Sequence, residues 1–171
     1  MTSARIISEA DIVPNRAAGY RLVNGELKNQ EWVSPSVNTT ADGALYLSVL
    51  DLAKWDAALY GEKLLKTASL EKMWTRVKDK DGKTYHYGFG WVLGEINKHR
   101  VVGHGGHWQG FSAAITRFPD DRITVIVFAN LASVEADKLI AKVAAFYNRE
   151  LAGLRPKVLR NAGELRFLSS A

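Results

Sequence analysis

The chain has 171 residues, of which 47% are apolar and 24% are charged, close to the averages of soluble globular proteins. This composition excludes wholesale disorder and collagen-like repeats, and no apolar run approaches the ~20 residues that a membrane-spanning helix needs. Because the sequence has no cysteine, it also excludes disulfides, thiolate metal sites and a cysteine nucleophile.

The formal net charge of +5 is unevenly distributed along the chain. Residues 154–171 contain four basic residues and one acidic residue, so we interpret them as a solvated basic tail. A nucleic-acid site would have a denser run of Lys and Arg interleaved with aromatic residues, whereas this tail has Phe167 alone. We therefore expect no nucleic-acid partner.

Local patterns predict the elements of the N-terminal half. Asn24-Gly25 suits the tight turn of a small hairpin over residues 18–31. Ser48-Val-Leu-Asp51 fits a capping box and predicts a helix over residues 49–60. Apolar residues at helical spacing predict a second helix near residues 68–76.

After a polar turn built on Asp81-Gly82, the apolar pattern changes to the alternation of strands. Strands are predicted over 85–95, 99–104, 107–118 and 122–130, with Gly105-Gly106 separating the second from the third. The last strand is almost continuously apolar, so we expect it to be central in its sheet and covered on both faces.

Ser133 is predicted to cap a final helix. The buried stripe of that helix is expected to consist of Ile140, Val143, Ala144, Tyr147 and Leu151. The predicted fold class is therefore α+β: an antiparallel β-sheet meander flanked by helices, with a long C-terminal helix.

The most unusual stretch runs from Gly103 to Phe111, where four of nine residues are glycine. Glycine in a strand costs conformational entropy and packs no side chain, so it favours either a bulge or a place where a ligand approaches closely. His104 and His107 are three residues apart and would point to opposite faces of an extended segment, with no evident third ligand. We therefore expect no metal and no other cofactor.

His104-Gly105-Gly106 resembles the third motif of the serine β-lactamase and penicillin-binding protein superfamily, in its class C β-lactamase, esterase and D-Ala carboxypeptidase-like branch. That motif is Lys-Thr-Gly, or His-x-Gly in many members, on a strand that lines the active site. Other segments resemble the family in the same order. They are Ala41 to Ser48, Asp51 to Trp55, Leu70 to Trp74, Tyr87-Gly88-Phe89-Gly90-Trp91, and Pro119 to Asn130.

The resemblance implies a role for each residue of the motif. His104 would be the catalytic residue of this strand and would face the nucleophile and the polar groups of the substrate. Gly105 and Gly106 would bind substrate by keeping the wall flat, and the backbone N–H of His107 would donate to the oxyanion, a contact typically worth ~3–4 kcal/mol of barrier. The alternative for His104 is a strand histidine bonded to a neighbouring backbone group.

The resemblance also indicates what is missing. The family's nucleophile is the serine of Ser-x-x-Lys, assisted by the lysine and by the tyrosine of Tyr-x-Asn, and both motifs lie upstream of everything matched here. We therefore expect residues 1–153 to be the C-terminal part of a β-lactamase-like domain. Ser69-Leu-Glu-Lys72 satisfies Ser-x-x-Lys, but no Tyr-x-Asn follows it and Ser69 is a candidate N-cap, so we interpret it as a decoy.

Two functions remain open from the sequence. The first is a fragment of a serine acyl-hydrolase that cleaves esters, β-lactams or D-amino-acid peptides through an acyl-enzyme, and that is inactive alone because the nucleophile is absent. The alternative is a non-catalytic peptide-binding or protein-interaction module of the same fold. An ordinary imidazole, unlike lysine, is mostly neutral at pH 7, so His104 in the motif favours esterases and peptidases over a dedicated β-lactamase.

The expected partners are a small-molecule or peptide acyl substrate and further copies of the chain. Self-association is expected because the missing half would leave a sheet edge and apolar surface exposed. Members of the superfamily are commonly exported, which implies a periplasmic or secreted parent, but residues 1–11 do not resemble a signal peptide.

Overall fold

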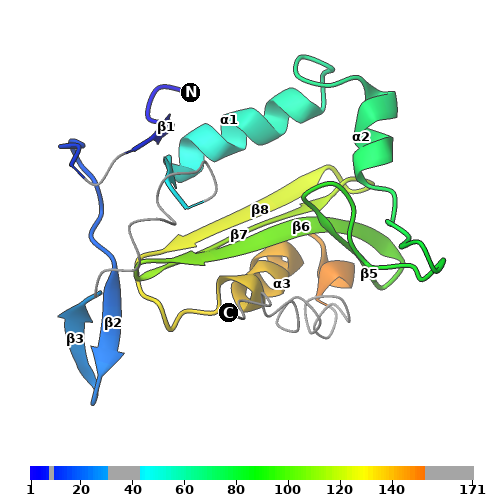
Figure 1. Cartoon of the computed structure of the whole chain (residues 1–171). Coiled ribbons are helices and arrows are strands. Elements are labelled where there is room, and N and C mark those ends of the chain that lie inside the picture. Colours follow the sequence, from blue (N-terminus) through cyan, green and yellow to red (C-terminus); the bar gives the residue numbers. More distant parts are fainter. Residues whose placement is uncertain (8–9, 31–42, 153–171) are drawn as a thin grey trace. The chain divides into compact units, whose positions relative to one another are not determined.

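The computed structural model describes residues 1–7, 10–30 and 43–152 (Figure 1). The predicted basic tail, 154–171, lies outside the described residues. The chain divides into two compact units. The first unit contains Met1–Leu64, Gly105–Ala114 and Ile126–Ala136, and the second contains Leu65–His104, Ile115–Val125 and the residues from Asp137 onward.

The first unit contains two small antiparallel pairs of strands. β1 (Arg5–Ile6) pairs with β4 (Leu45–Tyr46), and β2 (Tyr20–Val23) pairs with β3 (Glu26–Asn29). Asn24 and Gly25 join β2 to β3 with φ values of 52° and 83°, the left-handed conformation that this turn requires. The predicted hairpin is therefore confirmed.

Helix α1 (Val49–Leu59) begins after Ser48, whose side chain accepts a hydrogen bond from the backbone N–H of Asp51. The reciprocal half of the capping box is replaced by a different set of contacts. The buried Asp51 carboxylate accepts hydrogen bonds from the backbone N–H groups of Thr2, Ser3 and Ala4 and from the Ser3 hydroxyl. The hydroxyl and the amide of Ser3 are the largest causes that hold the pKa of Asp51 well below its ordinary value.

Helix α2 (Thr67–Met73) opens the second unit, and its N-cap is Lys66, which makes no side-chain capping bond. Ser69 lies in the first turn, with its backbone N–H 2.8 Å from the carbonyl oxygen of Lys66. The prediction that Ser69 is the N-cap is wrong, because the helix begins at Thr67 and its N-cap, Lys66, lies three residues before Ser69.

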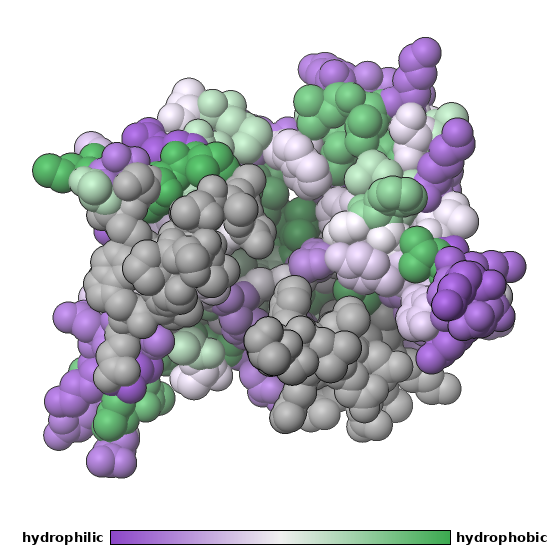
Figure 2. All heavy atoms as spheres, viewed as in Figure 1, coloured by the Kyte–Doolittle hydropathy of each residue, from purple (hydrophilic) through white to green (hydrophobic). Residues whose placement is uncertain are grey.

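The turn between α2 and β5 is a hydrophilic projection, visible at the right of Figures 1 and 2. Lys78 and Thr84 form a bridge across it, and Gly82 adopts a φ of 81°. The Tyr85 hydroxyl donates to the Asp79 carboxylate at 2.9 Å and is the main reason why the pKa of Asp79 lies below its ordinary value. The predicted polar turn is thus confirmed.

Four strands form the largest sheet, in the order β5-β6-β7-β8. Their bounds are Val92–Ile96, His99–Trp108, Phe111–Phe118 and Ile123–Ala129. Consecutive strands are neighbours and are joined by short turns, which is the geometry of an antiparallel meander, so the predicted α+β fold class is confirmed. The expected start of β5 at residue 85 is wrong, because residues 85–91 form a separate bridged turn.

Two further expectations for this sheet are wrong. β6 continues through Gly105-Gly106 to Trp108, and the turn falls at Gln109-Gly110, whose φ values of 43° and 85° reverse the chain. In the described part of the chain β8 is the last strand in the order rather than a central one, and Val125 is its one buried residue.

Helix α3 (Ala136–Tyr147) is followed by a short 3-10 helix, η2 (Arg149–Leu151). The helix begins after residue 135, so the predicted cap at Ser133 is wrong. Ile140, Ala144 and Leu151 are buried as predicted, but Val143 and Tyr147 are 37% and 77% exposed. No described helix combines the length and the hydropathy that crossing a membrane would take.

Apolar side chains at most 9% exposed form the core of the second unit. They are Leu70, Trp91, Val92, Leu93, Ile96, Val101, Val102, Phe118, Val125, Ile140, Ala144 and Leu151.

Candidate active site

The predicted motif lies on β6, where His104, Gly105, Gly106 and His107 are all exposed. Successive side chains of a strand point to opposite faces, so His104 and Gly106 share one face while Gly105 and His107 share the other. The structure therefore brings one imidazole and one glycine of the motif to the same face. The second imidazole, that of His107, belongs to the opposite face, as expected for residues three apart.

The imidazole of His104 lies beside the phenol of Tyr87. The Tyr87 hydroxyl oxygen and His104 Nε2 are 3.1 Å apart, within hydrogen-bond distance. The two rings meet edge to face, with centroids 6.1 Å apart and an interplanar angle of 68°. Sequence reasoning placed Tyr87 in a family-like segment but missed this contact, because no spacing rule links residues 17 positions apart.

A glycine-dependent turn holds Tyr87 in place. The backbone carbonyl of Tyr87 accepts a hydrogen bond from the backbone N–H of Val77 at 2.9 Å. Tyr87 also forms a bridge with Val92, the first residue of β5. The next residue is buried Gly88, where a Cβ atom would collide with the carbonyl oxygen of Met73. The backbone that carries the phenol is thus fixed on both sides.

The glycines of β6 differ in what they leave room for. A Cβ atom on Gly103 would lie 2.9 Å from Thr116 Oγ1 and 3.0 Å from the carbonyl oxygen of Ile115, so packing of the sheet requires glycine there. A Cβ atom on Gly106 would meet no described atom within 4 Å, and Gly105 and Gly106 are not among the residues with positive φ. Neither sterics nor backbone conformation among the described residues explains the absence of a side chain at Gly106.

The hairpin that joins β6 to β7 fixes the direction of the backbone groups of the motif. In a two-residue hairpin, the residues that flank the turn, Trp108 and Phe111, exchange backbone hydrogen bonds. Along β6 the N–H groups of successive residues then point alternately toward β7 and away from it. The N–H groups of Gly105 and His107 therefore point to the edge of β6 opposite β7. The pairing of β5 with β6 ends at Val92↔Gly103, so β5 does not extend along that edge beside His107.

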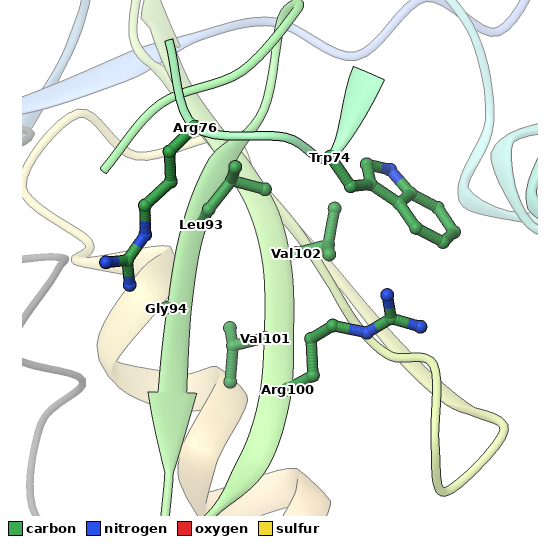
Figure 3. A pocket seen from close by; sticks show the side chains of 7 residues that line it. All are labelled: Trp74, Arg76, Leu93, Gly94, Arg100, Val101 and Val102. Carbon is green, nitrogen blue, oxygen red and sulfur yellow. The ribbon is translucent and has the colours of Figure 1, made fainter. Parts of the chain in front are cut away.

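A small cavity of about 140 Å³ lies elsewhere in the second unit (Figure 3). It is lined by Trp74, Arg76, Leu93, Gly94, Arg100, Val101 and Val102. Arg100 pairs with Glu71 at 3.1 Å and with Asp120 at 3.4 Å, and its guanidinium lies over the ring of Trp74. The cavity lining offers no carboxylate, imidazole or hydroxyl for acid–base chemistry, so His104 on β6 is the better candidate site.

Within the described ranges, no three His, Asp or Glu side chains gather in a way that could hold a metal ion. On the face of β6 that carries His104, the motif offers one imidazole beside the phenol of Tyr87, and backbone N–H groups lie along the edge of the strand.

Comparison with known proteins places the chain in a family. Penicillin-binding protein 4* of Bacillus subtilis (strain 168) is 35% identical over 121 residues, which are 70% of this chain and 27% of that relative. An octameric penicillin-binding protein homologue from Pyrococcus abyssi superposes with a TM-score of 0.69 and 27% identity, covering 86% of this chain and 34% of that one. A penicillin-binding protein from Bacillus halodurans shares the fold, with a TM-score of 0.67 and 22% identity over 85% of this chain and 45% of that one.

The chain therefore spans between about a quarter and a half of the length of the proteins that it resembles. Residues 1–148, which are most of the chain, match the Beta-lactamase family. On that match, and on a fold shared with penicillin-binding proteins, the chain belongs to the Beta-lactamase family.

Proposed function

We propose that residues 104–107 form one wall of the acyl-transfer site of a serine hydrolase that acts on esters, β-lactams or D-amino-acid peptides through an acyl-enzyme. The observation that carries this proposal is the exposed imidazole of His104 on β6, two residues before a glycine whose side-chain position is open. Membership of the Beta-lactamase family supports a serine acyl-hydrolase.

Each residue of the wall has a distinct role in this proposal. His104 contacts the polar groups of the substrate, and Gly106 leaves room for the acyl group on the same face. Gly105 keeps the opposite face of the strand small, since its Cβ position is 3.6 Å from the carbonyl oxygen of Ala113. The backbone N–H of His107 points to the edge that β5 does not cover, where it is suited to donate to an oxyanion.

The attacking hydroxyl is proposed to come from sequence outside these 171 residues. The chain has no Ser-x-x-Lys followed by Tyr-x-Asn, and Ser69 lies in the first turn of a seven-residue helix. The catalytic wall would then be inactive alone and would need a Ser-x-x-Lys segment on the same or another polypeptide.

An activity probe tests this assignment directly. We expect neither a fluorophosphonate nor a fluorescent penicillin to leave a mass adduct on the isolated chain. When the chain is combined with the polypeptide that carries Ser-x-x-Lys and Tyr-x-Asn, the adduct should appear on that serine, and His104→Ala should reduce its rate of formation while His86→Ala should not. An adduct on Ser69 of the isolated chain, or an unchanged rate in His104→Ala, would contradict the proposal.

The second candidate is a non-catalytic module that binds peptides or another chain with the same strand, favoured by the absence of the paired serine and tyrosine motifs from the sequence. If this alternative holds, the isolated chain should bind a peptidoglycan-like peptide with micromolar or better affinity in calorimetry and no combination of chains should become acylated.

We also propose that the chain self-associates. β8 ends the strand order in the described part of the chain, and unpaired strand edges recruit other strands. One of its structural relatives is an octamer.

A further inference from the structure

His99, the first residue of β6, lies between two carboxylates that come from different elements. Its Nδ1 is 2.8 Å from Oδ2 of Asp121, in the turn between β7 and β8, and its Nε2 is 3.1 Å from Oε2 of Glu150, in η2. All three residues belong to the second unit. One imidazole thus connects the start of β6 to the far turn of the sheet on one side and to η2 on the other.

Both contacts together require the doubly protonated ring. An ionised carboxylate only accepts hydrogen bonds, so each ring nitrogen needs a proton in order to donate to its carboxylate. The neutral imidazole carries one proton and satisfies one carboxylate. Its other nitrogen then directs a lone pair at a carboxylate oxygen, and two acceptors at that distance repel each other.

The contact to Glu150 is the one that is lost when the ring becomes neutral. Asp121 is the closer carboxylate, and its side chain is 12% exposed, whereas that of Glu150 is 76% exposed and is readily solvated in place of the ring. Asn148 also donates to the second oxygen of Asp121, which holds that carboxylate in position. The remaining proton therefore stays on Nδ1, and Nε2 faces Glu150 as an acceptor.

The charge of the ring is governed by these two carboxylates. The other charged residues in the segments around it are Lys98, Arg100, Asp120, Arg122 and Arg149. Among the described residues, none of these five makes a hydrogen bond or an ion pair with His99, and Asp120 is paired with Arg100. The bond to Asp121, followed by that to Glu150, raises the pKa of His99, so the ring stays charged above pH 6.5.

We propose that His99 makes the attachment of η2 to the sheet depend on pH: the protonated ring holds Glu150 and with it η2, and the neutral ring lets η2 open locally. Opening is partial, because Leu151 of η2 is fully buried and Asn97 donates to the backbone carbonyl of Glu150 at 2.6 Å. This switch lies outside the proposed acyl-transfer wall at residues 104–107 and does not depend on it.

Hydrogen exchange of the Leu151 backbone N–H tests the proposal on the full chain. This N–H donates to the carbonyl oxygen of Asn148 at 3.0 Å, so it exchanges when η2 opens. Its protection, relative to the exchange rate of an unstructured chain at the same pH, should be about fivefold lower at pH 8.5 than at pH 6, the change that one ordinary hydrogen bond gives. The N–H of buried Leu93, which donates to the carbonyl of His86, should stay at least tenfold better protected at pH 8.5.

Glu150→Gln is the decisive variant. A carboxamide accepts from the protonated ring and donates to the neutral one, so the protection of Leu151 should differ by less than twofold between the two pH values. Glu95→Gln is the matched control, because it removes the same charge from an exposed residue of β5 that does not contact His99. This control should keep the fivefold change.

Three results would overturn the proposal. The first is a Leu151 protection that does not fall with rising pH in the unmodified chain, and the second is the same fall in Glu150→Gln. The third is equal protection of Leu151 and Leu93 at pH 8.5, because η2 would then open only when the whole unit unfolds. If Glu150→Gln does not fold, the first and third comparisons still decide, and neither involves an acyl substrate.

Discussion

Nδ1 of His99 lies 2.8 Å from Oδ2 of Asp121, and this contact ties the first residue of β6 to the turn between β7 and β8. On its other side, Nε2 of His99 lies 3.1 Å from a carboxylate oxygen of Glu150 in η2. Asn148 donates to the second oxygen of Asp121 at 2.9 Å. The hydrogen bond to Asp121, followed by that to Glu150, raises the pKa of His99 above its ordinary value.

The stability that His99 contributes should fall as the pH rises. A group with a raised pKa in the folded state contributes fully below its unfolded pKa of about 6.5 and loses that contribution as the pH passes the folded pKa. The difference in unfolding free energy between the unmodified chain and His99→Gln, from urea titrations, should therefore be larger at pH 6 than at pH 9. The same difference is measured for His86→Gln, which removes an exposed imidazole outside this set of contacts, as the control.

The stability that the Asp51 carboxylate contributes should fall as the pH falls, the opposite of the dependence expected for His99. Because its pKa is lowered by hydrogen bonds in the folded state, its contribution is present above the ordinary pKa of about 3.9 and is lost as the pH falls. Asp51→Asn should destabilise the chain at pH 7, and the difference should shrink below about pH 4. Asp81→Asn, in the exposed polar turn, should have little effect at either pH in the same urea titrations.

Alanine substitutions at Gly103 and Gly106 of β6 should have opposite effects on stability, and Gly106→Ala should also affect acylation. Gly103→Ala should lower the melting temperature, because its Cβ would press on Thr116 and the backbone of Ile115. Gly106→Ala should raise the unfolding free energy by about 0.4–1 kcal/mol, because it restricts the unfolded chain at a position with room for a methyl group. If the proposed wall is correct, Gly106→Ala should nevertheless slow acylation of the combined chains, so equal stability losses from both variants would argue against this account.

Phe118 should be a major determinant of stability in the second unit. It is 0% exposed on β7, and replacing a fully buried phenylalanine by alanine costs about 3–5 kcal/mol. Phe146 on α3 is 89% exposed, so Phe146→Ala should change the unfolding free energy by less than about 0.5 kcal/mol. Chemical denaturation of the two variants compares the same side-chain deletion in two environments.

Self-association should depend on concentration and on β8. Light scattering should give a mass above 18.9 kDa at high concentration. Thr124→Pro on β8 removes a backbone donor and should shift the mass toward that of the monomer. A single monomeric mass throughout the concentration range would refute the proposal.

Local chemistry made much of the fold predictable. The Asn24-Gly25 turn needs left-handed backbone at both residues, and Ser48 supplies the side-chain acceptor that starts α1, so both positions follow from the residues themselves. The four strands of the sheet follow from apolar alternation. In contrast, the permissive backbone of Gly105-Gly106 predicts a break between strands, but permissive residues fit an extended strand as well as a turn, and β6 runs through both.

Tertiary contacts account for what the sequence did not predict. Apolar character at positions 143 and 147 predicts burial on α3, but the described structure leaves both side chains exposed. For the candidate site, the motif itself indicated His104 and its glycines. The partner of His104, Tyr87, is brought there by its local bridge to Val92 and by the pairing of Val92 with Gly103, and residue types alone do not fix the register of that pairing.

The uninterrupted course of β6 limits where residues can be inserted or deleted. β6 is one strand of ten residues, His99–Trp108, that begins at the His99 contacts with Asp121 and Glu150 and contains the whole motif, so the face of each side chain follows from its position along the strand. A single inserted or deleted residue between His99 and His104 would move the imidazole of His104 to the far side of the sheet, away from the phenol. We expect viable insertions to cluster instead in the exposed turn at 78–84.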